Sequence, residues 1–322
     1  YLFGDIKDES VLAKALEGVG VIFHEAAIVG VGQSMYEVKK YVDVNTMSTA
    51  KLLNILVNRE HEVKKLIVAS SMSIYGEGAY VCEDCGVVYP SLRGEAQLKQ
   101  REWEMKCPKC GKIVKPIPTS EDKPLYPSSI YAITKRDQEE MCLVVGRAYG
   151  IPTVALRYFN VYGPRQSLNN PYTGVCAIFS ARIKNNNSPL IFEDGLQSRD
   201  FVSVHDIVEA NILAMESSNA NYEVFNVGTG KATRILDIAQ LLIKLYNKDK
   251  ELKPEITYKY RAGDIRHCFA DISKIKNKLA FKPKVQFVEG MKELVEWGEK
   301  EEAEDKFEEA HEELLRRGLV EK

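Results

Sequence analysis

The first 160 residues of this chain alternate short apolar runs with longer amphipathic stretches, and this pattern constrains the fold more than any other feature. Runs of strand length lie at 19–24, 66–71 and 153–158, whereas 43–58 and 129–150 have the apolar spacing of helices. Strands that alternate with helices form parallel sheets. The sequence therefore predicts an α/β fold built on a parallel sheet.

One of the predicted strands ends in two hydroxyl side chains. The apolar run Leu66–Ala69 is followed by Ser70 and Ser71. Open α/β sheets bind their ligands at the carboxyl ends of the strands. Ser70 and Ser71 are therefore expected to lie where chemistry takes place.

Tyr131 and Lys135 are four residues apart in the predicted helix 129–150, which places them on one face, a turn apart. A nearby ammonium favours the phenolate, so Lys135 is expected to lower the pKa of Tyr131 from about 10 toward neutrality and make it a general base. Such a spacing is also found in pairs of exposed helix residues without any function. The neighbouring motifs decide between the two interpretations.

Four of the seven cysteines form two Cys-x-x-Cys-Gly units, Cys82/Cys85 and Cys107/Cys110, with 21 residues between the inner pair. This spacing is close to that of a zinc ribbon and predicts a structural Cys₄ zinc site. Disulfides and free thiols are the alternatives. Metal-binding cysteines are typical of a reducing compartment, so a cytoplasmic protein is expected.

The charge balance excludes some partners. The chain has 44 Lys and Arg against 46 Asp and Glu, without the basic excess that attracts nucleic acid or anionic lipid. No apolar run approaches the roughly 18 residues of a membrane span. A small-molecule partner is expected, with no nucleic acid and no membrane.

The predicted organisation has two lobes and one insert. Residues 1–165 form the sheet domain, interrupted at 77–122 by prolines, charges and the four cysteines. Residues 166–298 form mainly a smaller α/β lobe for substrate, and 299–322 form a charged C-terminal surface helix.

Several motifs in order resemble the extended short-chain dehydrogenase/reductases that act on nucleotide sugars, the NAD-dependent epimerases and dehydratases. They include Ala69–Gly76, Tyr131 with Lys135, and Leu156–Gln166, and further matching blocks are Gly4–Ile6, His24–Ala27, Val44–Asn45, Ser198–Val202, Phe225–Gly228 and Arg261–Asp264. The resemblance implies a doubly wound, Rossmann-like sheet.

The resemblance also implies site residues. The catalytic residues would be Ser71, Tyr131 and Lys135. Those around the dinucleotide would be Asp5, Ile6, Ala26, Ala27, Asn45, Ser70, Tyr131, Lys135 and Tyr158. Those around the substrate would be Ser71, Asn160, Arg199, Arg261, Asp264 and Cys268. For Asn45 a helix cap, and for Arg199 a surface ion pair, are alternative roles.

Removing hydride from a sugar alcohol requires an acceptor that no side chain provides, so a nicotinamide cofactor is expected. The resemblance implies NAD, held on a Gly-rich turn after the first strand. This sequence contains no such turn and is expected to lack the first roughly fifty to sixty residues of the family fold. We therefore expect these 322 residues alone to bind NAD weakly or not at all.

The residues after Ser71 bear on the reaction. Family dehydratases carry an Asp-Glu pair there and the decarboxylases a Glu, whereas this chain has Met72 and Ser73. The resemblance therefore implies 4-epimerisation and is greatest to dTDP-L-rhamnose 4-epimerases, which implies a dTDP-6-deoxyhexose. The alternatives are a UDP-glucose or UDP-N-acetylglucosamine 4-epimerase, and then a 4,6-dehydratase or decarboxylase.

The insert lies between Ser71 and Tyr131, so it is expected near the mouth of the pocket. It either covers the active site or stabilises a long loop or a subunit contact. The resemblance implies a homodimer through the helix 129–150. A rival hypothesis from another class is a non-catalytic binding module built on the zinc ribbon.

Overall fold

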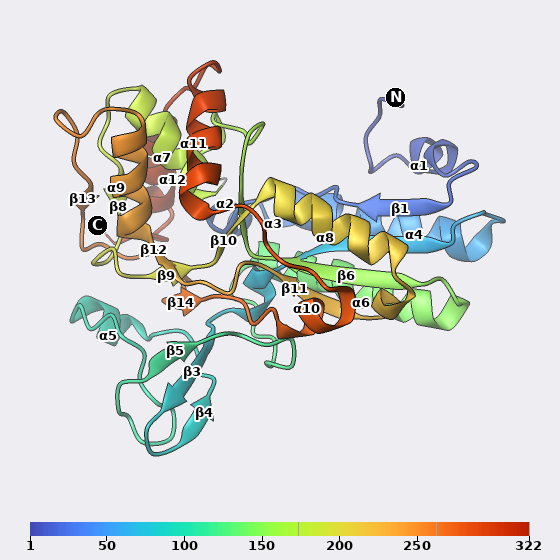
Figure 1. Ribbon diagram of the computed structural model, residues 1–322, viewed down its shortest axis with the longest axis horizontal. Coiled ribbons are helices and arrows are strands. Elements are labelled where there is room, and N and C mark those ends of the chain that lie inside the picture. The colour runs from blue at the N-terminus through green and yellow to red at the C-terminus, as the bar shows by residue number, and fades with distance from the viewer. Residues whose placement is uncertain (173, 262, 322) are drawn as a thin grey trace.

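In the computed structural model, which describes residues 1–172, 174–261 and 263–321, parallel strands form a central sheet in the order β1-β2-β6-β11 (Figure 1). Thr173, Ala262 and Lys322 lie outside the described residues. The strands are β1 (Val21–His24), β2 (Lys65–Ser71), β6 (Thr153–Tyr158) and β11 (Val224–Val227). The strands expected at 19–24, 66–71 and 153–158 are confirmed.

Helices cover both faces of this sheet. Leu66 and Val68 of β2 pack on one side, whereas Ile67 between them packs on the other. The first side is covered by α1 (Glu9–Ala15), α4 (Ser48–Asn58) and α6 (Ile130–Tyr149), and the second by α8 (Val204–Glu216) and α10 (Ser273–Leu279). The sheet is therefore doubly wound, as the family resemblance implies.

Helix α6 has clear start and stop signals. The Ser129 hydroxyl accepts a hydrogen bond from the Ala132 amide at 3.1 Å, and Gly150 ends the helix in the left-handed conformation at φ 69°. The helix expected at 43–58 is also present, but its first part is the π-helix η1 (Val42–Met47), which continues into α4.

The second lobe packs α7 (Val175–Lys184), α9 (Ile235–Leu245) and α11 (Phe287–Gly298) around a common apolar core. The other elements of the main body are α2 (Val31–Ser34), α3 (Val38–Tyr41), η2 (Met72–Tyr75), β7 (Asn160–Tyr162), β8 (Leu190–Ile191), β9 (Ser198–Arg199), β10 (Phe201–Ser203), η3 (Ser218–Ala220), β12 (Thr233–Arg234), β13 (Glu255–Ile256) and β14 (His267–Cys268).

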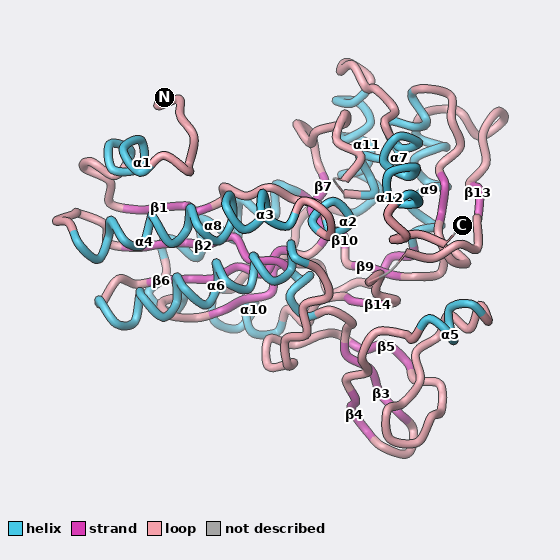
Figure 2. The backbone as a smooth tube through the Cα atoms, turned by 180° about the vertical axis from the view of Figure 1, so that it is seen from behind, coloured by secondary structure: helices cyan, strands magenta, loops and turns pink. Residues whose placement is uncertain are grey.

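The cysteine-rich segment, residues 77–122, forms a small lobe of its own beside β14 and β9 (Figures 1 and 2). Its antiparallel strands have the order β4-β3-β5, and α5 joins the outer two. Their bounds are β3 (Ala79–Cys82), β4 (Gly86–Val88), α5 (Glu95–Lys99) and β5 (Lys115–Ile117). Tyr80, Val88 and Met105 form its core with two of the cysteines.

The C-terminal segment differs from its prediction. Helix α12 spans only Phe307–Arg316, not the whole of 299–322. Leu314 packs with Phe192 of the second lobe and with Tyr36, so this is not a free surface helix. Among the described residues, no helix combines the length and apolarity needed to cross a membrane.

Candidate active site

Ser71, Tyr131 and Lys135 come together where β2 meets α6. Lys135 donates from Nζ to the main-chain oxygen of Ala69 at 2.6 Å and to Oε1 of Gln138 at 3.0 Å. Tyr131 lies one turn earlier on α6, the helix that contacts both β2 and η2. The three predicted catalytic residues therefore form one cluster at the carboxyl end of β2.

Burial controls the titration of this cluster. It raises the pKa of Tyr131 above its ordinary value, an effect that a hydrogen bond with Ser71 opposes. Burial also lowers the pKa of Lys135 to about 8, although the Glu25 carboxylate favours the ammonium. The expectation that Lys135 lowers the pKa of Tyr131 is wrong for this structure, because desolvation dominates and the ammonium bonds Ala69 and Gln138.

The turn after Ser71 faces a cavity. Ser73 donates from its hydroxyl to Oγ of Ser71 at 2.8 Å, and its amide donates to the same oxygen at 3.2 Å. Ser71 therefore accepts from Ser73 and keeps its own proton to donate. Met72 and Ser73 line the cavity directly, so no carboxylate follows Ser71 there.

A buried polar network lies behind this cluster. Ser70 donates to Oε2 of Glu139 at 2.5 Å, and Arg157 forms two bonds to the same carboxylate at 3.0 and 2.5 Å. Arg157 also donates to the Tyr75 hydroxyl at 2.8 Å. The Ser70 hydroxyl, predicted to face the dinucleotide, is instead directed into this network.

Asn45 fixes the loop that follows β1. Its Oδ1 accepts from the Ile28 amide at 2.9 Å, while Nδ2 donates to the Ile28 carbonyl at 3.1 Å and to Thr134 at 3.0 Å. It is fully buried, so it neither caps a helix nor lies open in a cleft. Its role is to tie the loop carrying Ala26 and Ala27 to α6.

The other residues predicted near the dinucleotide lie apart. Tyr158 donates to Glu25 at 2.8 Å and accepts from Asn211 at 2.7 Å, so its hydroxyl faces the end of β1. Asp5 is exposed and accepts from the Lys7 amide at 2.9 Å, while Ile6 packs beside the core under α1 and α4. Glu25 was not among the predicted site residues, although it stands in the His24–Ala27 block.

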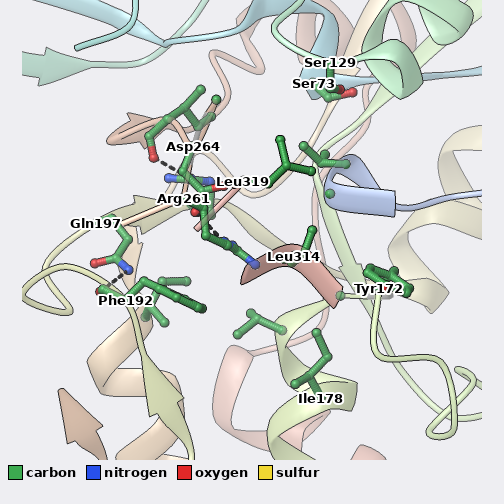
Figure 3. Close-up of a pocket in the computed structure, with 18 of the residues that line it drawn as sticks. Ser73, Ser129, Tyr172, Ile178, Phe192, Gln197, Arg261, Asp264, Leu314 and Leu319 are labelled. Atoms are coloured by element: carbon green, nitrogen blue, oxygen red, sulfur yellow. Dashed lines mark hydrogen bonds and ion pairs between the residues drawn. The ribbon is translucent and has the colours of Figure 1, made fainter. Parts of the chain in front are cut away.

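A cavity of about 310 Å³ opens beside Ser73 and extends between the second lobe and α12 (Figure 3). Asn160, Arg199, Arg261 and Asp264 all line it. Oδ1 of Asn160 is buried and has no hydrogen-bond partner among the described residues. An unsatisfied amide at a cavity wall is suited to a polar ligand.

Two arginines, Arg199 and Arg261, line this cavity together with the carboxylates of Glu193 and Asp264. Arg199 donates to the main-chain oxygens of Ser198, Ile265 and Arg266 at 2.8, 2.6 and 2.9 Å. Arg261 donates to Asp264 at 2.8 Å and lies 4.7 Å over the Phe192 ring. The Arg261 guanidinium and the Asp264 carboxylate face each other in Figure 3. Arg199 is therefore not part of a surface ion pair.

Cys268 does not border the cavity. Its side chain is 1% exposed and packs with Met72, Tyr75 and Ile265, and its sulfur lies 3.8 Å from the Thr119 hydroxyl. It belongs to the layer beneath the cavity, because the pleat of β14 directs it inward.

The C-terminal helix supplies a wall that was not predicted. Phe307, His311 and Leu314 line the cavity, and the His311 ring packs against Phe192 at a centroid distance of 5.8 Å. The helical spacing of Phe307, Ala310 and Leu314 was the available signal. It predicts an apolar face but not the surface that this face covers.

The four cysteines of the cysteine-rich segment converge. The sulfur atoms of Cys82, Cys85, Cys107 and Cys110 all lie within 4.8 Å of one another. Cys82 and Cys110 are 3.5 Å apart, well beyond the roughly 2.05 Å of a disulfide. Four thiols in this arrangement can hold a tetrahedral metal ion.

Comparison with known proteins places this geometry in a family. The model of the NAD dependent epimerase/dehydratase family matches residues 1–91 and 108–228. The chain is 35% identical to dTDP-L-rhamnose 4-epimerase of Burkholderia thailandensis, over 86% of this chain and 74% of that protein. It is 30% identical to a putative UDP-glucose 4-epimerase of Methanocaldococcus jannaschii, over 92% and 83% of the two chains.

Solved structures agree with this fold. UDP-N-acetylglucosamine 4-epimerase from Methanobrevibacter ruminantium, in complex with UDP-N-acetylmuramic acid, superposes with a TM-score of 0.73 at 34% identity, covering 91% of this chain and 81% of that one. UDP-glucose 4-epimerase from Thermotoga maritima, with UDP-glucose, gives 0.72 at 34% identity, covering 92% and 83%.

Proposed function

This chain belongs to the NAD dependent epimerase/dehydratase family, and from that premise we propose that it is an NAD-dependent 4-epimerase of nucleotide sugars. The observation that carries the proposal is the position of Ser71 and Tyr131 beside a cavity lined by Met72 and Ser73. The cluster can exchange a proton with an alcohol, and no carboxylate follows Ser71 to drive elimination of water.

The residues around Lys135 are compatible with NAD. An ammonium has three protons, and within the described part of the chain two are donated to protein groups, which leaves one for a ribose hydroxyl. Bound NAD would supply a hydride acceptor, and the hydride donor for the reverse step.

The side chains of the cluster would handle the proton and the orientation of the sugar. Ser71 would donate a hydrogen bond to the reacting oxygen at C4. Its own oxygen already accepts a hydrogen bond from the Ser73 hydroxyl, which leaves the Ser71 proton to be donated. Only the phenolate of Tyr131 can take up the hydroxyl proton, so its pKa, which burial raises, would have to fall when NAD binds, because the oxidised nicotinamide is positively charged. The phenol would return the proton to the same oxygen when the hydride returns on the opposite face. The sugar would rotate in the pocket between the two hydride transfers. Because the hydride removed in the first transfer is returned in the second, the reaction involves no net oxidation.

The substrate's diphosphate would lie against Asn160, Arg199 and Arg261. Both arginines can form charge-assisted bonds to it, and the side-chain NH₂ of Asn160 can donate to a phosphate oxygen, whereas its unpartnered Oδ1 can accept only from a donor such as a ligand hydroxyl. We place dTDP-L-rhamnose or another dTDP-6-deoxyhexose first, because the relative in Burkholderia thailandensis bears that name. UDP-glucose and UDP-N-acetylglucosamine are the alternatives, supported by the other relatives.

Parallel assays test this proposal. The protein is incubated with NAD and, separately, with dTDP-L-rhamnose, UDP-glucose or UDP-N-acetylglucosamine, and the products are resolved by NMR. We expect inversion at C4 of the dTDP sugar with no net NADH. Turnover of UDP sugars alone would contradict the assignment of the base and sugar, and elimination of water from a UDP sugar would contradict epimerisation.

We further propose that Cys82, Cys85, Cys107 and Cys110 hold a structural zinc ion. Four Cys ligands leave no coordination position for water, so the metal would stabilise the segment without taking part in the reaction. Elemental analysis should find about one zinc per chain. A Cys82→Ser/Cys110→Ser variant should lose it, whereas Cys142→Ala, which removes a core thiol elsewhere, should keep it.

A homodimer through α6 is proposed as well. Ile133 and Val144 of this helix are 42% and 63% exposed and, 11 residues apart, lie on nearly the same face, which gives an apolar surface suited to a subunit contact. Sedimentation of the wild type and of Val144→Glu would test it, since the substitution should give monomers.

A further inference from the structure

The cysteine-rich segment contacts the wall of the candidate substrate cavity through one buried arginine. The Arg93 side chain is 1% exposed, and its two terminal nitrogens donate to the two oxygens of the Glu193 carboxylate at 2.9 and 2.8 Å. It also donates to the main-chain oxygen of Asp264 at 3.2 Å. Glu193 and Asp264 both line the cavity.

In a second contact the cysteine-rich segment supplies the carboxylate and the main body supplies the arginine. Glu104 of the cysteine-rich segment accepts from the Arg266 guanidinium at 2.5 and 3.1 Å. The Arg266 side chain is fully buried and also binds Glu193 and Asp194, at 3.0 and 2.6 Å. An arginine and a carboxylate from the segment therefore hold residues 264 and 266 from behind.

The stretch 264–266 supports both candidate diphosphate arginines. Arg199 donates to the main-chain oxygens of Ile265 and Arg266, and Arg261 donates to the side chain of Asp264. If the 264–266 backbone moved, both guanidinium groups would move with it. Charge-assisted hydrogen bonds depend on the distance and angle between donor and acceptor, so such a shift would weaken binding of the diphosphate.

The two contacting residues are an addition to the family fold. The family model matches 1–91 and 108–228, so Arg93 and Glu104 both lie in the unmatched stretch between them. Their partner Glu193 lies inside the matched part. The Arg93 guanidinium, which belongs to the unmatched stretch, thus contacts a cavity residue in the part of the chain that the family model matches.

From these contacts we propose that Arg93 and Glu104 are positioning residues for the nucleoside diphosphate: through Glu193, Asp264 and Arg266 they hold Arg199 and Arg261 in their binding orientation. This inference rests on the proposed function, because it assumes that the cavity binds a nucleotide sugar. It also assigns the cysteine-rich segment a role in substrate affinity, in place of a lid or a mere loop stabiliser.

Titration calorimetry with dTDP and with UDP tests the proposal independently of turnover. The variants are Arg93→Ala, Arg93→Lys and the control Lys99→Ala, which removes an exposed ion pair with Glu95 in the same segment. Arg93→Ala should raise the Kd of whichever nucleotide the wild type binds more tightly by about tenfold, the effect of losing a buried charged hydrogen bond. Lys99→Ala should stay within about twofold of the wild type.

Kinetics separate positioning from catalysis. KM should rise with Kd in Arg93→Ala while kcat changes by less than about twofold, because Ser71, Tyr131 and Lys135 lie on β2 and α6. Arg93→Lys keeps the charge but loses the paired geometry and should give an intermediate Kd. If Arg93→Ala does not fold, the Kd of Arg93→Lys tests the proposal in its place.

A folded Arg93→Ala with wild-type Kd would overturn the proposal, and so would wild-type affinity in Arg93→Lys when Arg93→Ala fails to fold. A wild-type protein that binds neither dTDP nor UDP would instead overturn the proposed function. The two failures are therefore distinguishable.

Discussion

The Lys135 ammonium donates to the main-chain oxygen of Ala69 at 2.6 Å, two residues before Ser71. This bond ties α6 to the carboxyl end of β2. Since Tyr131 is one turn earlier on α6, the same contact sets the position of its phenol relative to Ser71. The proposed proton transfer at Tyr131 therefore depends on the contact between α6 and β2.

Tyr131→Phe should abolish most activity without affecting the fold. Removing a general base costs typically about 10²- to 10⁴-fold in rate, and we expect kcat to fall within this range. The Kd for the nucleoside diphosphate should be unchanged, because Tyr131 does not line the nucleotide cavity. Tyr149→Phe, an exposed tyrosine at the end of the same helix, is the matched control. Residual activity above a tenth of wild type would exclude Tyr131 as the base.

Glu139→Gln should destabilise the protein strongly, because Glu139 is the buried partner of Arg157. Removing one partner of a buried ion pair leaves an uncompensated charge and costs about 3–5 kcal/mol. Glu140→Gln, next to it, breaks only the exposed pair with Arg136 and should cost at most about 1 kcal/mol. Urea unfolding of both variants measures the difference. Equal midpoints would show that the Glu139 network adds no stability.

His24 should make the free energy of unfolding depend on pH. Burial, and then the Lys135 charge, lower its pKa from 6.5 to about 4. Between these values the unfolded chain binds more protons than the folded one, so stability falls as the pH falls from 6.5 to 4. Within this range the free energy of unfolding changes by at most about 1.4 kcal/mol per pH unit for this one group. His24→Gln removes the titration and can still bond Thr49, which lies 2.7 Å from Nε2. Urea unfolding at pH 7.5, 6 and 5 should show a shallower loss in the variant, and parallel curves would rule His24 out.

The central sheet and its helices could be predicted from the sequence because their signals are local. Ser129 and Gly150 mark the ends of α6, and the apolar run of β2 marks a buried strand. That Ser71, Tyr131 and Lys135 lie together could also be predicted, because each stands in a short motif that resembles the family; their catalytic roles stay a proposal.

The remaining parts of the site depend on contacts between distant residues. Arg93 and Glu193 are 100 positions apart, and nothing around either of them indicates a partner. The apolar face of α12 was visible in the sequence, but its packing on Phe192 was not. The pKa of Tyr131 was predicted in the wrong direction, because spacing shows proximity to Lys135 but not the loss of water around the phenol.

If the four cysteines hold zinc, as proposed above, removing the metal should weaken nucleotide binding. Arg93 and Glu104 lie in the chain between Cys85 and Cys107, so a metal held by all four cysteines fixes both ends of the loop that carries them. Without it, no ion joins the four thiols and the loop gains conformational freedom. We expect a chelator to raise the Kd for dTDP or UDP several-fold, and added zinc to restore it.

The same treatment of Arg93→Ala distinguishes the route of this effect. If the metal acts by holding Arg93 against Glu193, the variant has already lost that contact and the chelator should change its Kd much less than that of the wild type. Calorimetry of the two proteins, each with and without zinc, gives the coupling directly. If the chelator raised the Kd by the same factor in both proteins, the metal would affect the cavity by a path that does not include Arg93. Two changes that act through the same contact cannot each have their full effect when combined.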